Sequence, residues 1–153
     1  MKKLLFTLAG ASLLLTSCVK EPEACINLSP TGEIEVFDVL TMTSCSENAE
    51  TLEWTVEGSA SFFFAVDEEY IGESATHSWD MPGTYTIELN AISKNEKKED
   101  KTSTTVTVND ICYECVDTGG WTVTECGSYY FTADEFESEV DYWRNLGYTC
   151  TKK

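Results

Sequence analysis

The residues with the clearest capacity for chemistry in this chain of 153 residues are its seven cysteines. One of them, Cys18, follows an apolar N-terminal run. The other six are Cys25, Cys45, Cys112, Cys115, Cys126 and Cys150. An even number of thiols predicts disulfides if the chain is exported, whereas thiolates can also bind zinc or carry redox chemistry. The compartment and the elements that hold these cysteines decide between these chemistries.

The N-terminus predicts export and lipidation. Lys2 and Lys3 precede an apolar run over residues 4–15, which has the length of a signal-peptide core and is short for a bilayer span. The run ends in Leu15-Thr16-Ser17-Cys18, which resembles the cleavage site of bacterial lipoproteins. That resemblance implies removal of the signal peptide, residues 1–17, and a diacylglyceryl thioether on Cys18, usually with a further acyl chain on the new amine. More than one chain gives stable anchoring, so we expect attachment to a membrane through this lipid.

Residues 18–23 are expected to form a tether, because the sequence Val-Lys-Glu-Pro-Glu after Cys18 is charged and contains proline. A lysine followed by acidic residues after the lipidated cysteine resembles the surface-export signal of lipoproteins in Bacteroidota-type bacteria. The resemblance implies a cell-surface protein of the outer membrane, with a periplasm-facing anchor as the alternative.

The formal net charge of −17 limits the choice of partners. A strongly acidic surface repels nucleic acid and anionic lipid, so we exclude a nucleic-acid function. The charge favours solubility, and it would also suit a basic or cation-rich partner.

A strand-rich domain is predicted over residues 24–109. After the turn at Pro82-Gly83, apolar residues Tyr85, Ile87 and Leu89 alternate with polar ones, as in a strand with one buried face. A second alternating run covers residues 102–108, and a mixed-charge turn over residues 94–101 precedes it. We also expect strands over residues 25–28, 33–44 and 51–57, the last with Trp54 in the core.

The stretch around this turn resembles the end of a PKD domain, which is an immunoglobulin-like β-sandwich. The matching residues are His77, Trp79, Pro82, Gly83, Thr84, Tyr85, Thr86, Ile87 and Leu89. The segment 43–49 resembles a turn of PKD-containing lipoproteins whose cysteine pairs with one at the domain start, which implies a Cys25–Cys45 disulfide. The sequence Trp54-Thr55-Val56-Glu57-Gly58-Ser59 departs from the family's Trp-Asp-Phe-Gly-Asp-Gly, so any cation binding by that acidic turn is not carried over.

Residues 110–153 predict a small disulfide-rich ββαβ module. Two short strands flank Asp117-Thr118-Gly119-Gly120, and a three-residue loop over 118–120 would place Cys112 opposite Cys126 and point Cys115 to the other face. Thr132-Ala133-Asp134-Glu135 has the form of a capping box. In the helix that follows, the apolar residues are three or four positions apart and therefore share one face. That face comprises Ala133, Phe136, Val140, Trp143 and Leu146. Gly147 ends the helix, and residues 148–150 return as a strand.

Three chemistries remain open for the last four cysteines. Structural disulfides are favoured, with Cys112–Cys126 and Cys115–Cys150 as the preferred pairs among three connectivities. A four-thiolate zinc site fits the spacing but suits an oxidising compartment poorly. A redox-active Cys112-x-x-Cys115 is the third alternative, although such pairs usually begin a helix. We expect neither a metal nor another cofactor.

Aromatic residues are the candidate contacts for a partner. Neighbouring strand residues face opposite ways, so at least one ring of Phe62, Phe63 and Phe64 should point outward, unless a loop or the next domain covers it. The module adds Trp121, Tyr129 and Tyr130. The acidic run Asp67-Glu68-Glu69 lacks calcium-loop spacing and is expected to be a solvated loop.

These features predict a binding protein rather than an enzyme. His77 is the only histidine, so the chain has no second histidine for a metal-hydrolase ligand set and no obvious catalytic triad. The place of His77 in the sequence suggests that it packs or forms a hydrogen bond at a turn. We therefore expect a non-catalytic outer-membrane lipoprotein that binds or adheres to a glycan or a protein. The alternatives are an accessory subunit of an envelope complex for secretion, gliding or glycan uptake, and a thiol-redox or zinc-binding protein.

Overall fold

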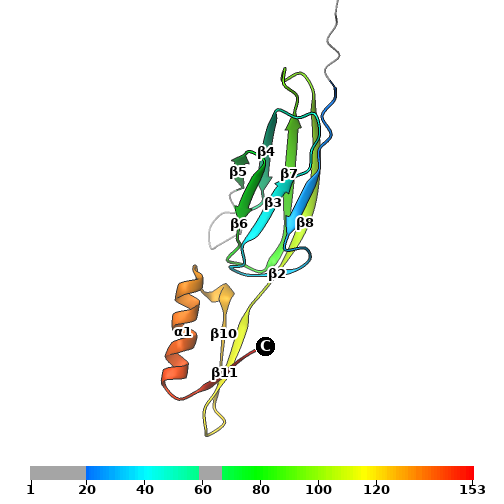
Figure 1. Cartoon of the computed structure of the whole chain (residues 1–153). Coiled ribbons are helices and arrows are strands. Elements are labelled where there is room, and N and C mark those ends of the chain that lie inside the picture. The colour runs from blue at the N-terminus through cyan, green and yellow to red at the C-terminus, as the bar shows by residue number, and fades with distance from the viewer. Residues whose placement is uncertain (1–19, 59–66) are drawn as a thin grey trace, which may run out of the picture.

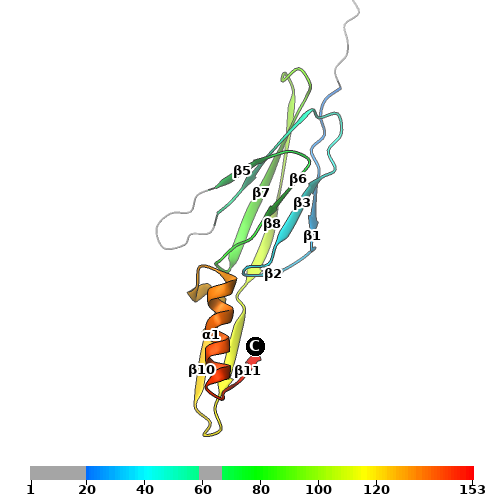
Figure 2. The same ribbon diagram turned by 60° about the vertical axis from the view of Figure 1, so that its left-hand side comes forward.

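The computed structural model describes residues 20–58 and 67–153 and shows a mainly β protein with one long helix. Figures 1 and 2 show an elongated molecule, with a larger β region toward the N-terminal end and the helix at the other end. The signal peptide, Cys18 and the candidate contacts Phe62, Phe63 and Phe64 lie outside the described residues. None of the helices in the described ranges is long and apolar enough to cross a bilayer.

The larger β region contains two sheets. One has the order β1-β3-β6 and consists of β1 (Ile26–Ser29), β3 (Leu40–Ser44) and β6 (Ser74–His77). The other has the order β2-β8-β7-β4-β5. Its strands are β2 (Ile34–Glu35), β4 (Thr51–Val56), β5 (Glu68–Ile71), β7 (Gly83–Ile92) and β8 (Glu99–Asn109). All pairs are antiparallel except β2 with β8.

The two sheets share one apolar core. Strand β7 alternates as predicted, with Tyr85, Ile87 and Leu89 buried and the residues between them more exposed. Leu40 and Met42 of β3 are buried in the same cluster from the other sheet. Trp54 is almost wholly buried, which confirms its predicted place in the core, and its indole donates a hydrogen bond to the Gly72 carbonyl oxygen (2.9 Å).

The prediction of one long strand over residues 33–44 is wrong. Phe37 adopts a left-handed backbone conformation (φ 69°), and the chain passes there from β2 in one sheet to β3 in the other. The Phe37 N–H donates to the Trp79 carbonyl oxygen (2.8 Å), and the Asp38 carboxylate accepts the Glu35 N–H (2.9 Å). These bonds offset the cost of positive φ for a residue with a Cβ.

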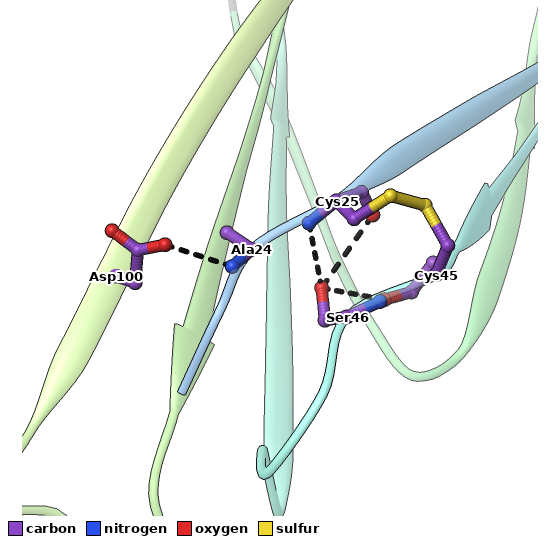
Figure 3. Close-up of a disulfide and its surroundings, with 6 residues drawn as sticks. Ala24, Cys25, Cys45, Ser46 and Asp100 are labelled. Atoms are coloured by element: carbon purple, nitrogen blue, oxygen red, sulfur yellow. Dashed lines mark hydrogen bonds between the residues drawn. A yellow bond between two sulfur atoms is a disulfide. The ribbon is translucent and has the colours of Figure 1, made fainter. Parts of the chain in front are cut away.

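The expected tether is also shorter than predicted, because its second half packs on the fold. Glu23 and Glu47 exchange two backbone hydrogen bonds of 3.0 Å, and Pro22 is buried. Lys98 pairs with Glu21 (3.1 Å). Ala24 donates its N–H to the Asp100 carboxylate (2.8 Å), beside the Cys25–Cys45 disulfide, which joins the residue before β1 to the residue after β3 (Figure 3). A charged segment can dock when its backbone finds partners, which composition does not reveal.

The C-terminal module contains a third sheet with the order β10-β9-β11, formed by β9 (Cys112–Val116), β10 (Thr122–Cys126) and β11 (Thr149–Lys152). The predicted hairpin register is confirmed, because Cys112 lies opposite Cys126 and the Asp117 N–H donates to the Trp121 carbonyl oxygen (3.0 Å). The short 3-10 helix η1 (Gly127–Tyr129) follows β10.

Helix α1 (Ala133–Asn145) covers one face of this sheet (Figures 1 and 2). The predicted cap is confirmed, because Thr132 Oγ1 accepts the Glu135 N–H (3.2 Å) and the Glu135 carboxylate accepts the Phe131 N–H (3.2 Å). Phe136 and Val140 are buried as expected. Leu146 is 55% exposed and does not belong to the buried face, because it caps the helix just before Gly147 turns the chain away.

Several contacts fasten the module to the larger β region. Within the module, beside the junction, the Asp110 carboxylate accepts hydrogen bonds from the Ser128 hydroxyl (2.5 Å) and the Ser128 N–H (3.0 Å). Lys152 pairs with Glu35 (2.5 Å). The ring of Phe37 lies 6.4 Å from that of Phe136, centroid to centroid. The junction is therefore a packed contact rather than an open linker.

Candidate functional site

The candidate contact aromatics of the module lie at opposite ends of its hairpin. Trp121 is 70% exposed in the turn between β9 and β10, whereas Tyr129 is 68% exposed in η1, beyond the other end of β10. The five residues of β10 separate the two ends by roughly 17 Å. Tyr130 is only partly exposed, since its hydroxyl donates to Glu125 (2.7 Å). The structure therefore does not bring these three residues into one surface.

The turn that carries Trp121 is held in one conformation by its own hydrogen bonds. Asp117 Oδ1 accepts the N–H groups of Gly119 (2.8 Å) and Trp121 (2.7 Å), and the Gly120 N–H donates to the Asp117 carbonyl oxygen (3.2 Å). Gly120 has φ 85°, which a residue with a Cβ adopts only at a cost. The turn thus presents an exposed indole from a fixed backbone.

This turn lies far from the N-terminal segment. Glu21 pairs with Lys98 next to the start of β8, and the other end of β8 leads through residues 110 and 111 into β9. Strand β8 alone, at eleven residues, spans roughly 35 Å. Figure 1 shows the β9–β10 turn at the opposite end of the molecule from the N-terminal segment.

Between β10 and α1, Glu125, which the sequence analysis did not single out, binds two aromatic side chains. Glu125 accepts one hydrogen bond from Tyr130 and another from the indole N–H of Trp143 (3.0 Å). Burial and the Glu125 carboxylate raise the pKa of the Tyr130 hydroxyl. The alternation of β10 could have placed Glu125 on the helix side with Val123, but nothing in the sequence indicates its partners.

A shallow groove runs along α1 beside this pair. Its volume is about 520 Å³. The lining residues, which we call the tyrosine groove, are Tyr130, Asp134, Glu135, Ser138, Glu139 and Tyr142. Tyr142 is 52% exposed, and three of the other lining residues carry carboxylates. The groove combines aromatic surface with negative charge.

Asp67, Glu68 and Glu69 are all exposed, as expected, but the prediction of a loop is wrong for Glu68 and Glu69, which belong to β5. Glu68 accepts a hydrogen bond from the Tyr70 hydroxyl and lies 3.5 Å from His77 Nδ1. The pKa of Tyr70 is raised to about 12, first by burial and then by Glu68. The acidic run is therefore partly used to bind neighbouring side chains.

His77 occupies an enclosed position on β6. Its side chain is 8% exposed, its Nδ1 lies 3.0 Å from the Tyr70 hydroxyl oxygen, and its ring packs edge-on against Trp79. Burial lowers the pKa of His77, although the charge of Glu68 opposes this effect. His77 therefore packs on Trp79 and forms a hydrogen bond with Tyr70, as its place in the sequence suggested.

All six cysteines of the described residues form disulfides, with the pairs Cys25–Cys45, Cys112–Cys126 and Cys115–Cys150. The preferred pairing is therefore confirmed. Cys112 and Cys115 are not bonded to each other, as a redox pair of that motif would be when oxidised. Asp110 lies within 4.8 Å of the Cys112 and Cys126 sulfurs, but zinc binds thiolates, and these two sulfurs are joined.

Comparison with known proteins gives no match to any family model and none to a curated protein.

Proposed function

We propose that this protein is a non-catalytic outer-membrane lipoprotein that binds a ligand through the tip of its C-terminal hairpin. In this proposal Cys18 carries the lipid, residues 24–109 form an immunoglobulin-like sandwich of the PKD type, and residues 110–153 form a disulfide-rich ββαβ module. Two sheets that share one apolar core support the proposal of a sandwich over residues 24–109. The element order β9, β10, α1, β11 supports the proposal of a ββαβ module over residues 110–153.

The observation that carries the proposal is the position of Trp121. A large indole that is 70% exposed on a hydrogen-bonded turn offers a ligand an apolar ring from a fixed backbone. Tryptophan is also enriched among residues that dominate binding energies. Because the turn is already ordered, little conformational entropy is lost on binding.

The geometry of the N-terminal segment supports a role away from the membrane. Residues 21–24 are fastened to the β7–β8 end of the fold through Lys98, Glu47 and Asp100. A lipid on Cys18 would hold that end near the bilayer, and the larger β region would then act as a spacer for the hairpin tip. An acidic surface would also keep the protein from lying on anionic lipid.

The test is retention of a ligand by the full chain with its disulfides intact. The wild-type protein, Trp121→Ala and Ile71→Ala would be immobilised and exposed to a polysaccharide panel and to detergent-solubilised outer membrane. Ile71 is a matched control, because it is also exposed but lies on β5 of the larger β region. We expect selective retention that Trp121→Ala abolishes and Ile71→Ala preserves.

The retained material distinguishes the kinds of ligand. A retained polysaccharide would support adhesion to a glycan, since indole rings stack on the apolar faces of sugars. Stoichiometric capture of one membrane protein, with no polysaccharide retained, would instead support the accessory-subunit alternative. Retention that is the same for all three proteins would contradict a binding role for the hairpin tip.

A further inference from the structure

The tyrosine groove offers a binding surface that is separate from Trp121. Its two aromatic residues come from different elements, because Tyr130 follows η1 and Tyr142 lies in the third turn of α1. The Tyr130 hydroxyl is already bound to Glu125, so the groove offers the aromatic ring of this residue rather than a free hydroxyl. The surface is therefore suited to a group that packs against π-systems.

The charge of the groove is entirely negative. Of its three carboxylates, Glu135 caps α1 by accepting the Phe131 N–H, whereas Asp134 and Glu139 form no ion pair with any residue in the described ranges. The charge of Glu139 reaches Tyr130, where it contributes to the raised pKa of the hydroxyl. A cation would relieve the repulsion among these carboxylates while packing against the rings.

The other flank of α1 shows the same combination with a cation in place. There the Arg144 guanidinium carbon lies 5.4 Å from the centre of the Tyr113 ring, and Arg144 pairs with the Asp141 carboxylate (2.8 Å). The chain thus fills one tyrosine–carboxylate surface of the helix with its own arginine. The tyrosine groove has a similar set of side chains, and none of its lining residues is a lysine or arginine.

We propose that the tyrosine groove binds a lysine or arginine side chain of a partner polypeptide. The apolar stem of such a side chain would lie along Tyr130 and Tyr142, and its charged end would reach Asp134 or Glu139. A basic polypeptide matches the groove and the net charge of −17, whereas a second copy of this acidic chain would be repelled. This inference does not depend on the role proposed for Trp121.

The probe is a short synthetic peptide of alternating lysine and glycine, and the same peptide with acetylated lysines serves as the uncharged control. The full chain with intact disulfides would be titrated at low salt and its binding followed by NMR. Tyr142→Ala should weaken binding about threefold to fivefold, from the lost cation–π contact. Glu139→Gln should weaken it about twofold, and the double variant about tenfold.

Two matched variants separate the groove from general attraction to an acidic chain. Glu137→Gln removes a carboxylate from the same helix outside the groove, and Trp121→Ala removes the proposed hairpin contact; both should leave binding of the lysine peptide unchanged. Equal weakening by Glu137→Gln and Glu139→Gln would overturn the proposal. Undetectable binding, equal binding of the acetylated peptide, or self-association that Tyr142→Ala abolishes would overturn it as well.

Discussion

Gly127 is packed against Val36 so closely that a Cβ added to the glycine would lie 2.6 Å from Val36 Cγ2. The same Cβ would lie 2.9 Å from Ile111 Cγ2 and 3.2 Å from the Phe37 ring. Gly127 begins η1, and its N–H donates to the Ile111 carbonyl oxygen (2.8 Å). At this glycine the C-terminal module is therefore packed directly against Val36 and Phe37 of the larger β region.

Gly127→Ala should destabilise this junction, because the added methyl group has no space without movement of Val36 or Ile111. We expect the free energy of unfolding to fall by about 1–3 kcal/mol, as for overpacked cores. Thermal and denaturant unfolding would measure it. Gly119→Ala is the control, since its added Cβ would make only ordinary contacts with Asp117, and its effect should stay within about 0.5 kcal/mol. Similar stability of the two variants would show that the junction is not closely packed.

Glu125→Gln should weaken the attachment of α1 to its sheet. A glutamine side chain can accept the Trp143 indole N–H with its carbonyl oxygen and donate its amide to the Tyr130 oxygen, but both bonds then lose the charge of the carboxylate. Replacing two hydrogen bonds to a charged group by two neutral ones predicts destabilisation by about 1–3 kcal/mol in total. Chemical denaturation would measure the change, and Glu137→Gln, at an exposed position of α1, should have almost no effect. An equal effect at both positions would contradict the account of Glu125.

The Cys115–Cys150 disulfide should contribute strongly to the stability of the C-terminal module. It closes a loop with a sequence separation of 35 residues, and Cys115 is fully buried. The chain-entropy model gives about 4 kcal/mol for a loop of this length. In the double variant Cys115→Ala, Cys150→Ala, the amides of β11 and α1 should therefore exchange faster than in the wild-type chain, while the amides of the larger β region keep their protection. Unchanged protection in both elements would contradict this prediction.

His77 should titrate below its ordinary pKa of 6.5, because burial disfavours its charged form. The folded state then binds a proton less readily than the unfolded state. The stability from neutral His77 is therefore present above pH 6.5 and is lost as the pH falls through the folded-state pKa. Since this is the only histidine, NMR can follow its titration without ambiguity.

A variant of Glu68 tests the cause of this shift. The Glu68 charge raises the pKa of His77 and so opposes the effect of burial; Glu68→Gln should therefore lower this pKa further. The carboxylate of Glu69 is not among the causes of the shift, so the control variant Glu69→Gln should leave the pKa unchanged. A His77 pKa at or above 6.5 in the wild-type protein would show that the ring is more accessible to water than the structure indicates.

Local sequence signals predicted much of the module and of the strands. Asp117-Thr118-Gly119-Gly120 specified the hairpin register because glycine at positive φ closes the turn, and the register in turn placed Cys112 opposite Cys126. The Thr132–Glu135 cap specified the start of α1 because it depends on four consecutive residues. Features that a few neighbouring residues determine can be identified in this way.

The features that sequence analysis missed depend on distant partners. The change of sheet at Phe37 needs the Trp79 carbonyl, 42 residues later, and no glycine or proline marks it. In the sequence, Glu125 looks like an exposed strand glutamate, because only the folded structure brings Tyr130 and Trp143 within hydrogen-bond distance of it. The tyrosine groove likewise exists only because η1 returns the chain beside α1.

The most direct test of the central claim compares ligand retention by the wild-type chain and by Trp121→Ala, with disulfides intact and with Ile71→Ala as the control. A hairpin tip that acts as the contact site predicts loss of about 2 kcal/mol or more of binding free energy for Trp121→Ala and little change for Ile71→Ala. Full retention by Trp121→Ala of a ligand that the wild-type chain binds would contradict the claim.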